Sequence, residues 1–235
     1  AKLLGYRTYA DYRIDDAMAK TPSAARTLLE RVWPGARRKA ERERDQLEAL
    51  LQAERQNEPL AAWDWRHYAE KHRKAEFAID GAALKPYFQL DNMIRAAFDT
   101  TGRLFGLGFR ERFDVPLYHP DVRAWEVVDR EGKVVALFMG DYFHRPSKRS
   151  GAWMTSFRDQ ERLEGERLPV VVNVMNFTRG GGGAPTLLSL DDARTLFHEF
   201  GHALHGMLPN VTYPSLSGTS VDRDFVELPS QLFEN

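Results

Sequence analysis

The chain has 235 residues, of which 43% are hydrophobic and 29% are charged, a composition typical of a globular protein. Its 33 basic and 34 acidic residues nearly cancel, so the overall charge does not indicate binding to nucleic acid or to an anionic membrane. Cysteine is absent, which excludes disulfides and thiolate metal sites, and no apolar run approaches the ~20 residues that span a bilayer. A cysteine-free chain is typical of a reducing compartment and predicts a cytoplasmic protein.

Residues 1–115 are expected to be mostly helical. Thr21 and Pro22 form a helix start, with the threonine as the cap and the proline at the first helical position. The sequence Trp33-Pro34-Gly35 is expected to end that helix. A second, longer helix is predicted over Ala36–Gln56, and its mixed charges indicate a solvated helix rather than a nucleic-acid surface.

Residues 116–178 are expected to form a small sheet. Three helical or turn segments precede it: a helix opening at Trp63-Asp64-Trp65, a turn capped by Asp80, and a helix with a core-facing stripe over Leu90–Phe105. Four strands are predicted, at Trp125–Asp129, Val134–Asp141, Ala152–Phe157 and Val170–Phe177. The last of these is nearly continuous in apolar residues, as a strand buried on both faces would be.

Residues 189–235 carry the motif with the clearest chemical meaning. The run from His198 to His202 reads H-E-x-x-H, and two imidazoles four residues apart on a helix lie on one face and can bind one ion. Glu199 beside them can take a proton from water on that ion. Ser189 with Asp192 predicts a capping box that starts this helix, and a proline follows its end.

A zinc site in an enzyme takes three protein ligands and leaves one position for water. A third His in the extended pattern H-E-x-x-H-x-x-G-x-x-H is excluded, because His205 stands where glycine is needed. Among the acids further along the chain, Glu227 is the best candidate, since it lies in an amphipathic segment that predicts a rigid helix. Gln231, His205 and Glu234 are candidates for orienting the ligand imidazoles.

The segment Phe197–Glu234 contains H-E-F-G-H-A-L-H-G, then S-G-T and D-F-V-E-L-P-S-Q. It resembles the thimet oligopeptidase and peptidyl-dipeptidase family of zinc metallopeptidases. Upstream, Leu3–Tyr6, Tyr118–Arg123 and Gly151–Met154 are similar to the bacterial peptidyl-dipeptidase branch, so the resemblance covers nearly the whole chain. In that family the third zinc ligand is the Glu of E-x-P-S-Q, which corresponds to Glu227.

The resemblance implies a mainly α fold with a small β-sheet (α+β), the zincin-like catalytic core of a larger, mostly helical two-lobed peptidase. Family members are much longer on both sides, so the chain is expected to be an internal piece of such a protein. We see no linker that would separate two domains and expect residues 1–235 to be part of one catalytic domain. The missing N- and C-terminal portions are expected to complete the cleft and to supply the groups that stabilise the tetrahedral intermediate.

Three hypotheses about function follow. The first is hydrolysis of short peptides with one zinc ion held by His198, His202 and Glu227 and with Glu199 as the general base, releasing C-terminal dipeptides. The second is an endo-acting oligopeptidase with the same chemistry, which the sequence does not separate from the first. The third is a non-catalytic, zinc-binding piece. Substrate is expected to pair with the edge strand at Gly151–Met154, and the chain alone is expected to have little or no activity.

Overall fold

The computed structural model describes residues 1–55, 59–78 and 81–235. The chain divides into two compact units, Ala1–Ala83 and Leu84–Asn235, and each is described by itself. The expected cap Asp80 and the expected helix end Gln56 lie outside the described residues. Among those residues, no helix combines the length and the apolar character that crossing a bilayer would require.

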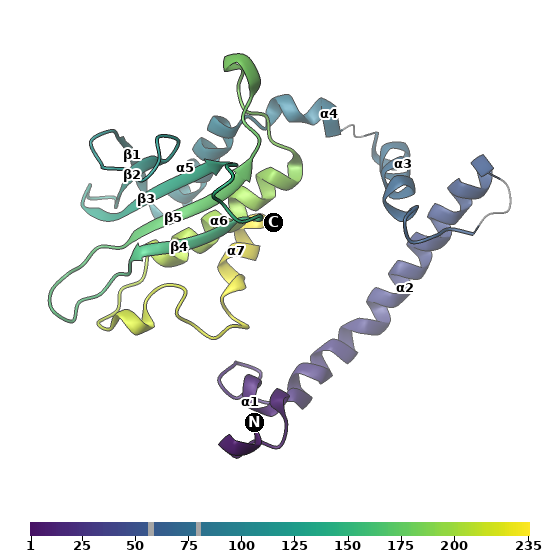
Figure 1. Ribbon diagram of the computed structural model, residues 1–235, viewed down its shortest axis with the longest axis horizontal. Helices are drawn as coiled ribbons and strands as arrows, with labels where there is room; N and C mark the ends of the chain where they lie inside the picture. The colour runs from purple at the N-terminus through teal and green to yellow at the C-terminus, as the bar shows by residue number, and fades with distance from the viewer. Residues whose placement is uncertain (56–58, 79–80) are drawn as a thin grey trace. The chain divides into compact units, whose positions relative to one another are not determined.

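The first unit is helical, as the sequence predicts. Its helices are α1 (Tyr9–Ile14), α2 (Pro22–Arg55) and α3 (Trp65–Phe77), and a short α4 (Gly81–Leu84) follows (Figure 1). Leu47 and Leu51 of α2 pack with Tyr68 of α3 to form a small buried cluster. Beside it, the Lys71 ammonium lies 2.7 Å from the Glu54 carboxylate.

The expected helix break at Trp33-Pro34-Gly35 is wrong, because α2 continues through it with Pro34 inside the helix. The start is confirmed, since the Thr21 hydroxyl accepts a hydrogen bond from the Ala24 N–H at 3.2 Å. Proline removes one intrahelical hydrogen bond and glycine costs about 1 kcal/mol against alanine. The alanine-, arginine- and glutamate-rich sequence on either side has high helix propensity and carries the helix through both residues.

The second unit is built on a five-stranded sheet with the order β1-β2-β3-β5-β4. Its strands are β1 (Gly108–Arg112), β2 (Arg123–Val128), β3 (Val134–Phe143), β4 (Trp153–Arg158) and β5 (Val170–Phe177), and its main helices are α5 (Leu90–Phe105), α6 (Leu190–Met207) and α7 (Glu227–Glu234). The pair β3–β5 is parallel and the other three pairs are antiparallel. The mainly α fold with a small sheet is therefore confirmed.

The four predicted strands are present, but β1 is a fifth strand that the sequence analysis placed in the helical part. Three of its five residues are charged, which is a weak strand signal. Its stability comes from pairing with β2, where Arg112 contacts Glu126 at 2.9 Å, and its position at the sheet edge leaves the Arg110 side chain 61% exposed.

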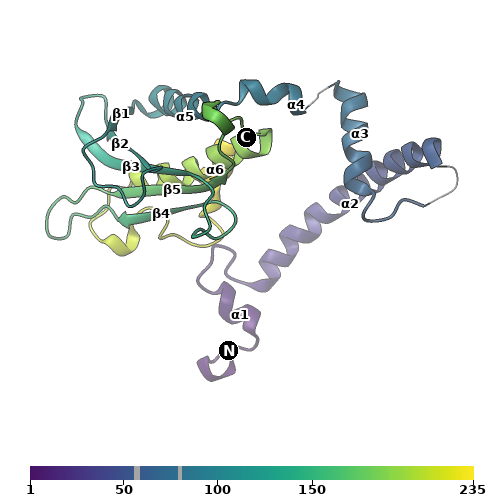
Figure 2. The ribbon, with the colours of Figure 1, turned by 45° about the horizontal axis from the view of Figure 1, so that its top comes forward.

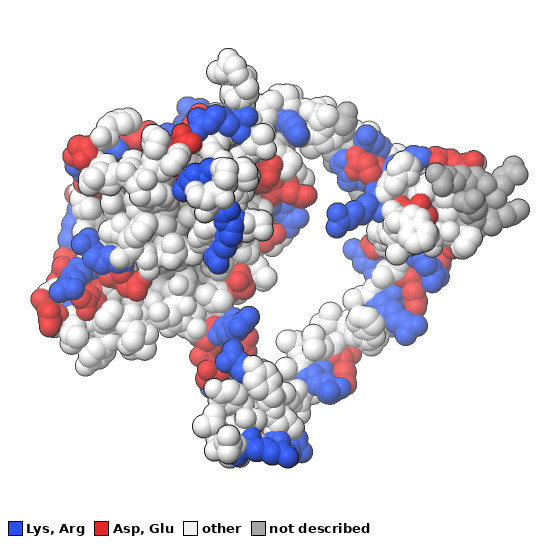
Figure 3. All heavy atoms as spheres, viewed as in Figure 1, with Lys and Arg blue, Asp and Glu red and all other residues white. Residues whose placement is uncertain are grey.

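Helices α5 and α6 cover one face of the sheet (Figure 2), and the main core lies between these two helices and the sheet. Phe200 of α6, Phe138 of β3 and Trp125 of β2 are buried there, with Phe98 stacked on Phe109 at 3.9 Å between ring centroids. Loops cover the opposite face of the sheet over a smaller cluster that includes Val172 and Val174. Strand β5 is therefore buried on both faces, as predicted. On the face shown in Figure 3, basic and acidic side chains of this unit are interspersed.

Candidate metal centre

Helix α6 starts where the sequence predicts. The Ser189 hydroxyl accepts a hydrogen bond from the Asp192 N–H at 3.0 Å, and the Asp192 carboxylate accepts one from the Ser189 N–H at 2.9 Å, which completes a capping box. The helix then runs to Met207. His198 and His202 lie one turn apart on it, with ring centroids separated by 5.0 Å.

Helix α7 brings Glu227 to these two imidazoles. Its Oε2 atom lies 3.3 Å from His198 Nε2 and 3.1 Å from His202 Nε2. The three ligand atoms all lie within 4.8 Å of one another. Ligand atoms that bind zinc tetrahedrally at about 2.0–2.1 Å lie roughly 3.3 Å apart. The two imidazole nitrogens and the carboxylate oxygen are therefore spaced to share one small divalent cation.

The protonation states of these groups also suit a cation. Burial lowers the pKa of His202, which favours the neutral imidazole that binds metals. Burial opposes ionisation of Glu227, but the Ser230 hydroxyl and the two imidazoles outweigh that effect, so the pKa of this carboxyl is lowered. A neutral imidazole and an ionised carboxylate are the forms in which these side chains act as ligands.

Neighbouring side chains hold the three candidate ligands in place. Glu234 Oε2 lies 2.9 Å from His198 Nδ1, and its other oxygen accepts a hydrogen bond from Arg194 at 3.0 Å. The buried Ser230 hydroxyl donates to Glu227 Oε2 at 2.9 Å. The sequence analysis named Glu234 as an orienting residue but not Ser230 or Arg194, although Ser230 lies inside the quoted segment E-L-P-S-Q.

The other two expected orienting residues have different surroundings. His205 packs against the ring of Phe225 at 6.3 Å between centroids, and burial lowers its pKa. The Nδ1 atoms of His202 and His205 are both buried and have no hydrogen-bond partner among the described residues. Gln231 is exposed on α7, and in the described part of the chain no hydrogen bond joins it to either imidazole of the H-E-x-x-H motif.

Glu199 differs from Glu227 in that its residue is buried and the pKa of its carboxyl group is raised. Its residue is only 7% exposed, and burial raises its pKa. The neighbouring Glu227 carboxylate acts in the same direction, whereas His198 and a hydrogen bond from the Met154 backbone N–H act in the opposite one. A carboxyl group with a raised pKa is a better proton acceptor near neutral pH than an ordinary glutamate.

Two hollows meet at this carboxyl group. One, of about 450 Å³, is lined by Ala152, Trp153, Met154, His198, Glu199, His202, Thr219, Val226 and Glu227. The other, of about 390 Å³, is lined by Ala152, Asp191, Arg194, Thr195, His198, Glu199 and Glu234. Both include Ala152, His198 and Glu199, so they are adjoining parts of one groove between α6 and the start of β4.

Strand β4 is an edge of the sheet, as its predicted role requires. It packs closely on α6 at Gly206, where a Cβ atom would lie 2.9 Å from Met154 Cε. Its neighbour on one side is β5, and Ala152 and Met154 line the groove on the other. Of the predicted residues Gly151–Met154, the structure therefore places the last three, Ala152, Trp153 and Met154, in a hollow with His198 and Glu199.

The family model described as Peptidase family M3 matches residues 1–235, and the chain belongs to this family. It is 47% identical to the dipeptidyl carboxypeptidase of Salmonella typhimurium and 47% identical to that of Escherichia coli, over all of this chain and 35% and 34% of those proteins. It is 38% identical to Escherichia coli oligopeptidase A, again over its full length and 35% of the relative. The chain thus spans about a third of the length of these curated relatives.

Proposed function

We propose that the protein to which this chain belongs is a zinc-dependent peptidase in which His198, His202 and Glu227 hold the metal ion. The observation that carries the proposal is the convergence of three ligand atoms from α6 and α7 beside the buried Glu199. Membership of peptidase family M3 supports peptide hydrolysis as the reaction. The donor set also fits zinc, since two imidazoles and a carboxylate with one open position are typical of catalytic zinc sites.

When bound, zinc would supply Lewis-acid chemistry, lowering the pKa of water and polarising the peptide carbonyl. Glu199 is the proposed general base. Its carboxylate takes the proton of the attacking water and then delivers that proton to the leaving amine nitrogen. The Glu199 side chain is buried in the groove wall beside Met154, next to the candidate metal ligands.

The groove also fits an extended peptide. An edge strand offers unpaired backbone N–H and C=O groups, and a substrate can pair with them as an additional strand. The segment Gly151–Met154, which leads into β4, is the proposed pairing edge because Ala152 lines both hollows, and Trp153 and Met154 line one of them, next to Glu199. Substrate bound there has its backbone beside the proposed metal ligands, whatever its side chains are.

We propose release of C-terminal dipeptides rather than internal cleavage, because identity is higher to the two dipeptidyl carboxypeptidases than to oligopeptidase A. Endo-acting hydrolysis is the alternative. Both are proposals about the whole protein, and we expect the 235-residue chain alone to bind zinc with little or no turnover. That residues 1–235 belong to one catalytic domain and that the protein is cytoplasmic remain predictions.

Zinc titration calorimetry tests the metal site directly. We expect Glu227→Ala to weaken zinc binding by more than the roughly 10–100-fold that follows the loss of an outer-shell contact. Glu131→Ala, a change at an exposed glutamate in the β2–β3 hairpin, serves as the matched control. Equal zinc affinity in Glu227→Ala and the unaltered chain would rule out Glu227 as a ligand.

The base is tested by peptide hydrolysis in the full-length protein. Glu199→Gln should abolish cleavage while zinc affinity stays within about twofold, because the base is not a metal ligand. Products of blocked and unblocked peptides distinguish C-terminal dipeptide release from internal cleavage. If zinc binds and neither kind of product forms, the proposed peptidase activity of the full-length protein is overturned.

A further inference from the structure

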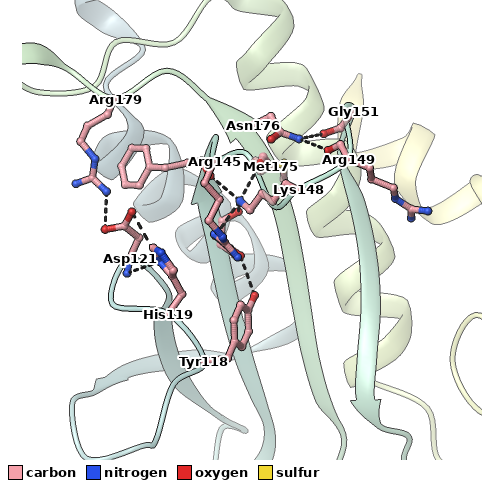
Figure 4. Close-up of polar contacts among 12 residues, drawn as sticks. Tyr118, His119, Asp121, Arg145, Lys148, Arg149, Gly151, Met175, Asn176 and Arg179 are labelled. Atoms are coloured by element: carbon pink, nitrogen blue, oxygen red, sulfur yellow. Dashed lines mark hydrogen bonds and ion pairs between the residues drawn. The ribbon is translucent and has the colours of Figure 1, made fainter.

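A second cluster of charged side chains lies outside the metal centre, at the end of β3 and in the loop between β3 and β4 (Figure 4). The Lys148 side chain is only 3% exposed and lies 2.8 Å from Asp141 Oδ1. Its ammonium also donates hydrogen bonds to three backbone carbonyls, those of Asp141 at 3.0 Å, Phe143 at 2.7 Å and Met175 at 2.7 Å. One buried cation thus joins the ends of β3 and β5 to the loop that carries it.

Asp141 balances this charge and fixes a second cation. Its carboxylate is fully buried and accepts two hydrogen bonds from Arg145 at 2.7 Å and one from the Tyr118 hydroxyl at 2.9 Å. Burial opposes ionisation, but these donors together with Lys148 outweigh it and lower the pKa of Asp141. Buried ion networks give little net stability compared with apolar packing, but the hydrogen bonds of this one join the loop to β3 and β5 in one arrangement. Their presence here indicates that the position of this loop matters.

Asn176 holds the next part of the same loop. Its side-chain Nδ2 donates to the Arg149 carbonyl at 2.9 Å and to the Gly151 carbonyl at 2.7 Å. Lys148 and Asn176 together therefore attach residues 148–151 to β3 and β5 through side-chain hydrogen bonds to backbone carbonyls. We call this pair the Lys148–Asn176 clamp.

The clamp ends where the groove begins. Ala152 follows the clamped Gly151 directly and lines both hollows, and Met154 lines one of them together with Glu199. Strand β4 pairs with β5 on one side only, from Trp153 onward. Within the described part of the chain, the residues just before that pairing have no strand neighbour, so their position depends on the clamp.

We propose that Lys148 and Asn176 are positioning residues that hold Ala152–Met154 in place, so that a peptide substrate pairing with this edge lies in register with Glu199. The proposal rests on the proposed peptidase function. Neither clamp residue touches the groove, so each acts through the backbone of the loop. Removing either side chain should increase the mobility of Ala152–Met154 and weaken peptide binding without changing zinc binding.

The test uses the full-length protein in a Glu199→Gln background, loaded with zinc, so that peptide binding is measured without cleavage. Lys148→Met removes the ammonium and keeps the length of the side chain. Asn176→Asp keeps the shape but removes the two N–H donors, and it provides the test if Lys148→Met does not fold. Lys133→Met, at a lysine that is 60% exposed beside Glu166, is the matched control.

Three quantities are measured for each chain: zinc affinity by chelator competition, hydrogen exchange of residues 152–157 by mass spectrometry, and affinity for a fluorescent oligopeptide. For both clamp variants we expect zinc affinity within about twofold, at least tenfold faster exchange and about tenfold weaker peptide binding. Lys133→Met should match the parent in all three.

The outcomes separate the two proposals. Faster exchange with unchanged peptide affinity overturns the positioning role, because the loop would then be merely structural, and unchanged exchange overturns it as well. A parent chain that binds no zinc contradicts the proposed function itself, which is seen before any clamp variant is compared. A parent that binds zinc but no peptide overturns the positioning proposal together with the substrate on which it rests.

Discussion

Gly201 of α6 packs against the backbone of Pro229 in α7 so closely that a Cβ atom at position 201 would lie 2.7 Å from the Pro229 carbonyl oxygen. The same atom would lie 2.7 Å from the Cα of Ser230. Glycine in a helix interior costs about 1 kcal/mol against alanine, so its presence here has a structural reason. Only a glycine lets α7 approach closely enough for Glu227 to reach His198 and His202.

Replacing Gly201 with alanine should therefore displace α7 and disturb the metal centre. We expect the free energy of unfolding to fall by about 1–3 kcal/mol, the usual range for overpacking a tight contact. Zinc affinity should fall as well, because Glu227 and Ser230 move with the helix. Denaturant unfolding and zinc calorimetry on the same preparation measure the two effects.

Gly35→Ala is the matched control for this prediction. Gly35 also lies in a helix, but no atom lies within 4 Å of the position that its Cβ would take. Alanine should therefore stabilise α2 by about 0.5–1 kcal/mol and leave zinc binding unchanged. If Gly201→Ala stabilises the chain in the same way, the close contact with α7 does not determine the position of Glu227.

The sequence identified the three candidate ligands that the fold brings together, but not most of the contacts that support them. His198, Glu199 and His202 follow from a fixed spacing on one helix, and the start of α6 follows from the local pattern of Ser189 and Asp192. Local signals of this kind depend on a few adjacent residues. The contact of Ser230 with Glu227 and the proximity of Arg194 to Glu234 depend on how α6 and α7 cross, which no spacing in the sequence encodes.

The same reasoning explains the two errors in the fold. Strand β1 is charged and its residues pair with residues 12 to 20 positions further along the chain, so its structure is set by tertiary contacts rather than by its own propensity. At Pro34, a strong local break signal is overridden by helix formers on both sides. The Lys148–Asn176 clamp has no sequence signature at all, since a lysine between an arginine and a serine in a loop usually lies in water.

Glu234→Gln tests the orientation of the first histidine ligand. The Glu234 carboxylate lies 2.9 Å from His198 Nδ1 and fixes which ring nitrogen carries the proton. A neutral amide is a weaker acceptor and can present its N–H group instead. We expect zinc affinity to fall about 10–100-fold, as is usual when an outer partner of a ligand histidine is lost.

Arg194→Met provides the comparison, because it removes only the group that contacts the other oxygen of Glu234. Its effect on zinc affinity should be smaller than that of Glu234→Gln. Zinc competition with a chromophoric chelator measures both variants. Equal affinity in Glu234→Gln and the unaltered chain would mean that Glu234 does not orient His198.

Ser230→Ala tests the support of the third ligand. The Ser230 hydroxyl is fully buried and donates to Glu227 Oε2 at 2.9 Å. Without it, the carboxylate gains rotational freedom and zinc affinity should fall about tenfold, which corresponds to about 1.4 kcal/mol. Ser215→Ala, at an exposed serine in the segment between α6 and α7, should leave zinc affinity unchanged. A loss in both variants would point to a general effect on folding rather than to Glu227.

The metal-free chain should lose stability as the pH falls below about 6.5. Burial lowers the pKa of both His202 and His205 in the folded state. An unfolded chain binds protons at these groups with the ordinary histidine pKa of about 6.5. Between the folded and the unfolded pKa the unfolded state therefore carries more protons, and its free energy falls relative to the folded state as the pH decreases.

Denaturant unfolding in the presence of a chelator, at several pH values from 7.5 to 5.5, measures this dependence. His205→Gln should reduce the pH dependence of the free energy of unfolding, because only the His202 imidazole then contributes a pKa lowered by burial. His144→Gln, at an exposed histidine in the loop after β3, should leave the slope unchanged. A free energy of unfolding that rises toward pH 5.5 would contradict the sign, because the folded state would then bind protons more tightly than the unfolded one. In that case burial would not be what controls these two imidazoles.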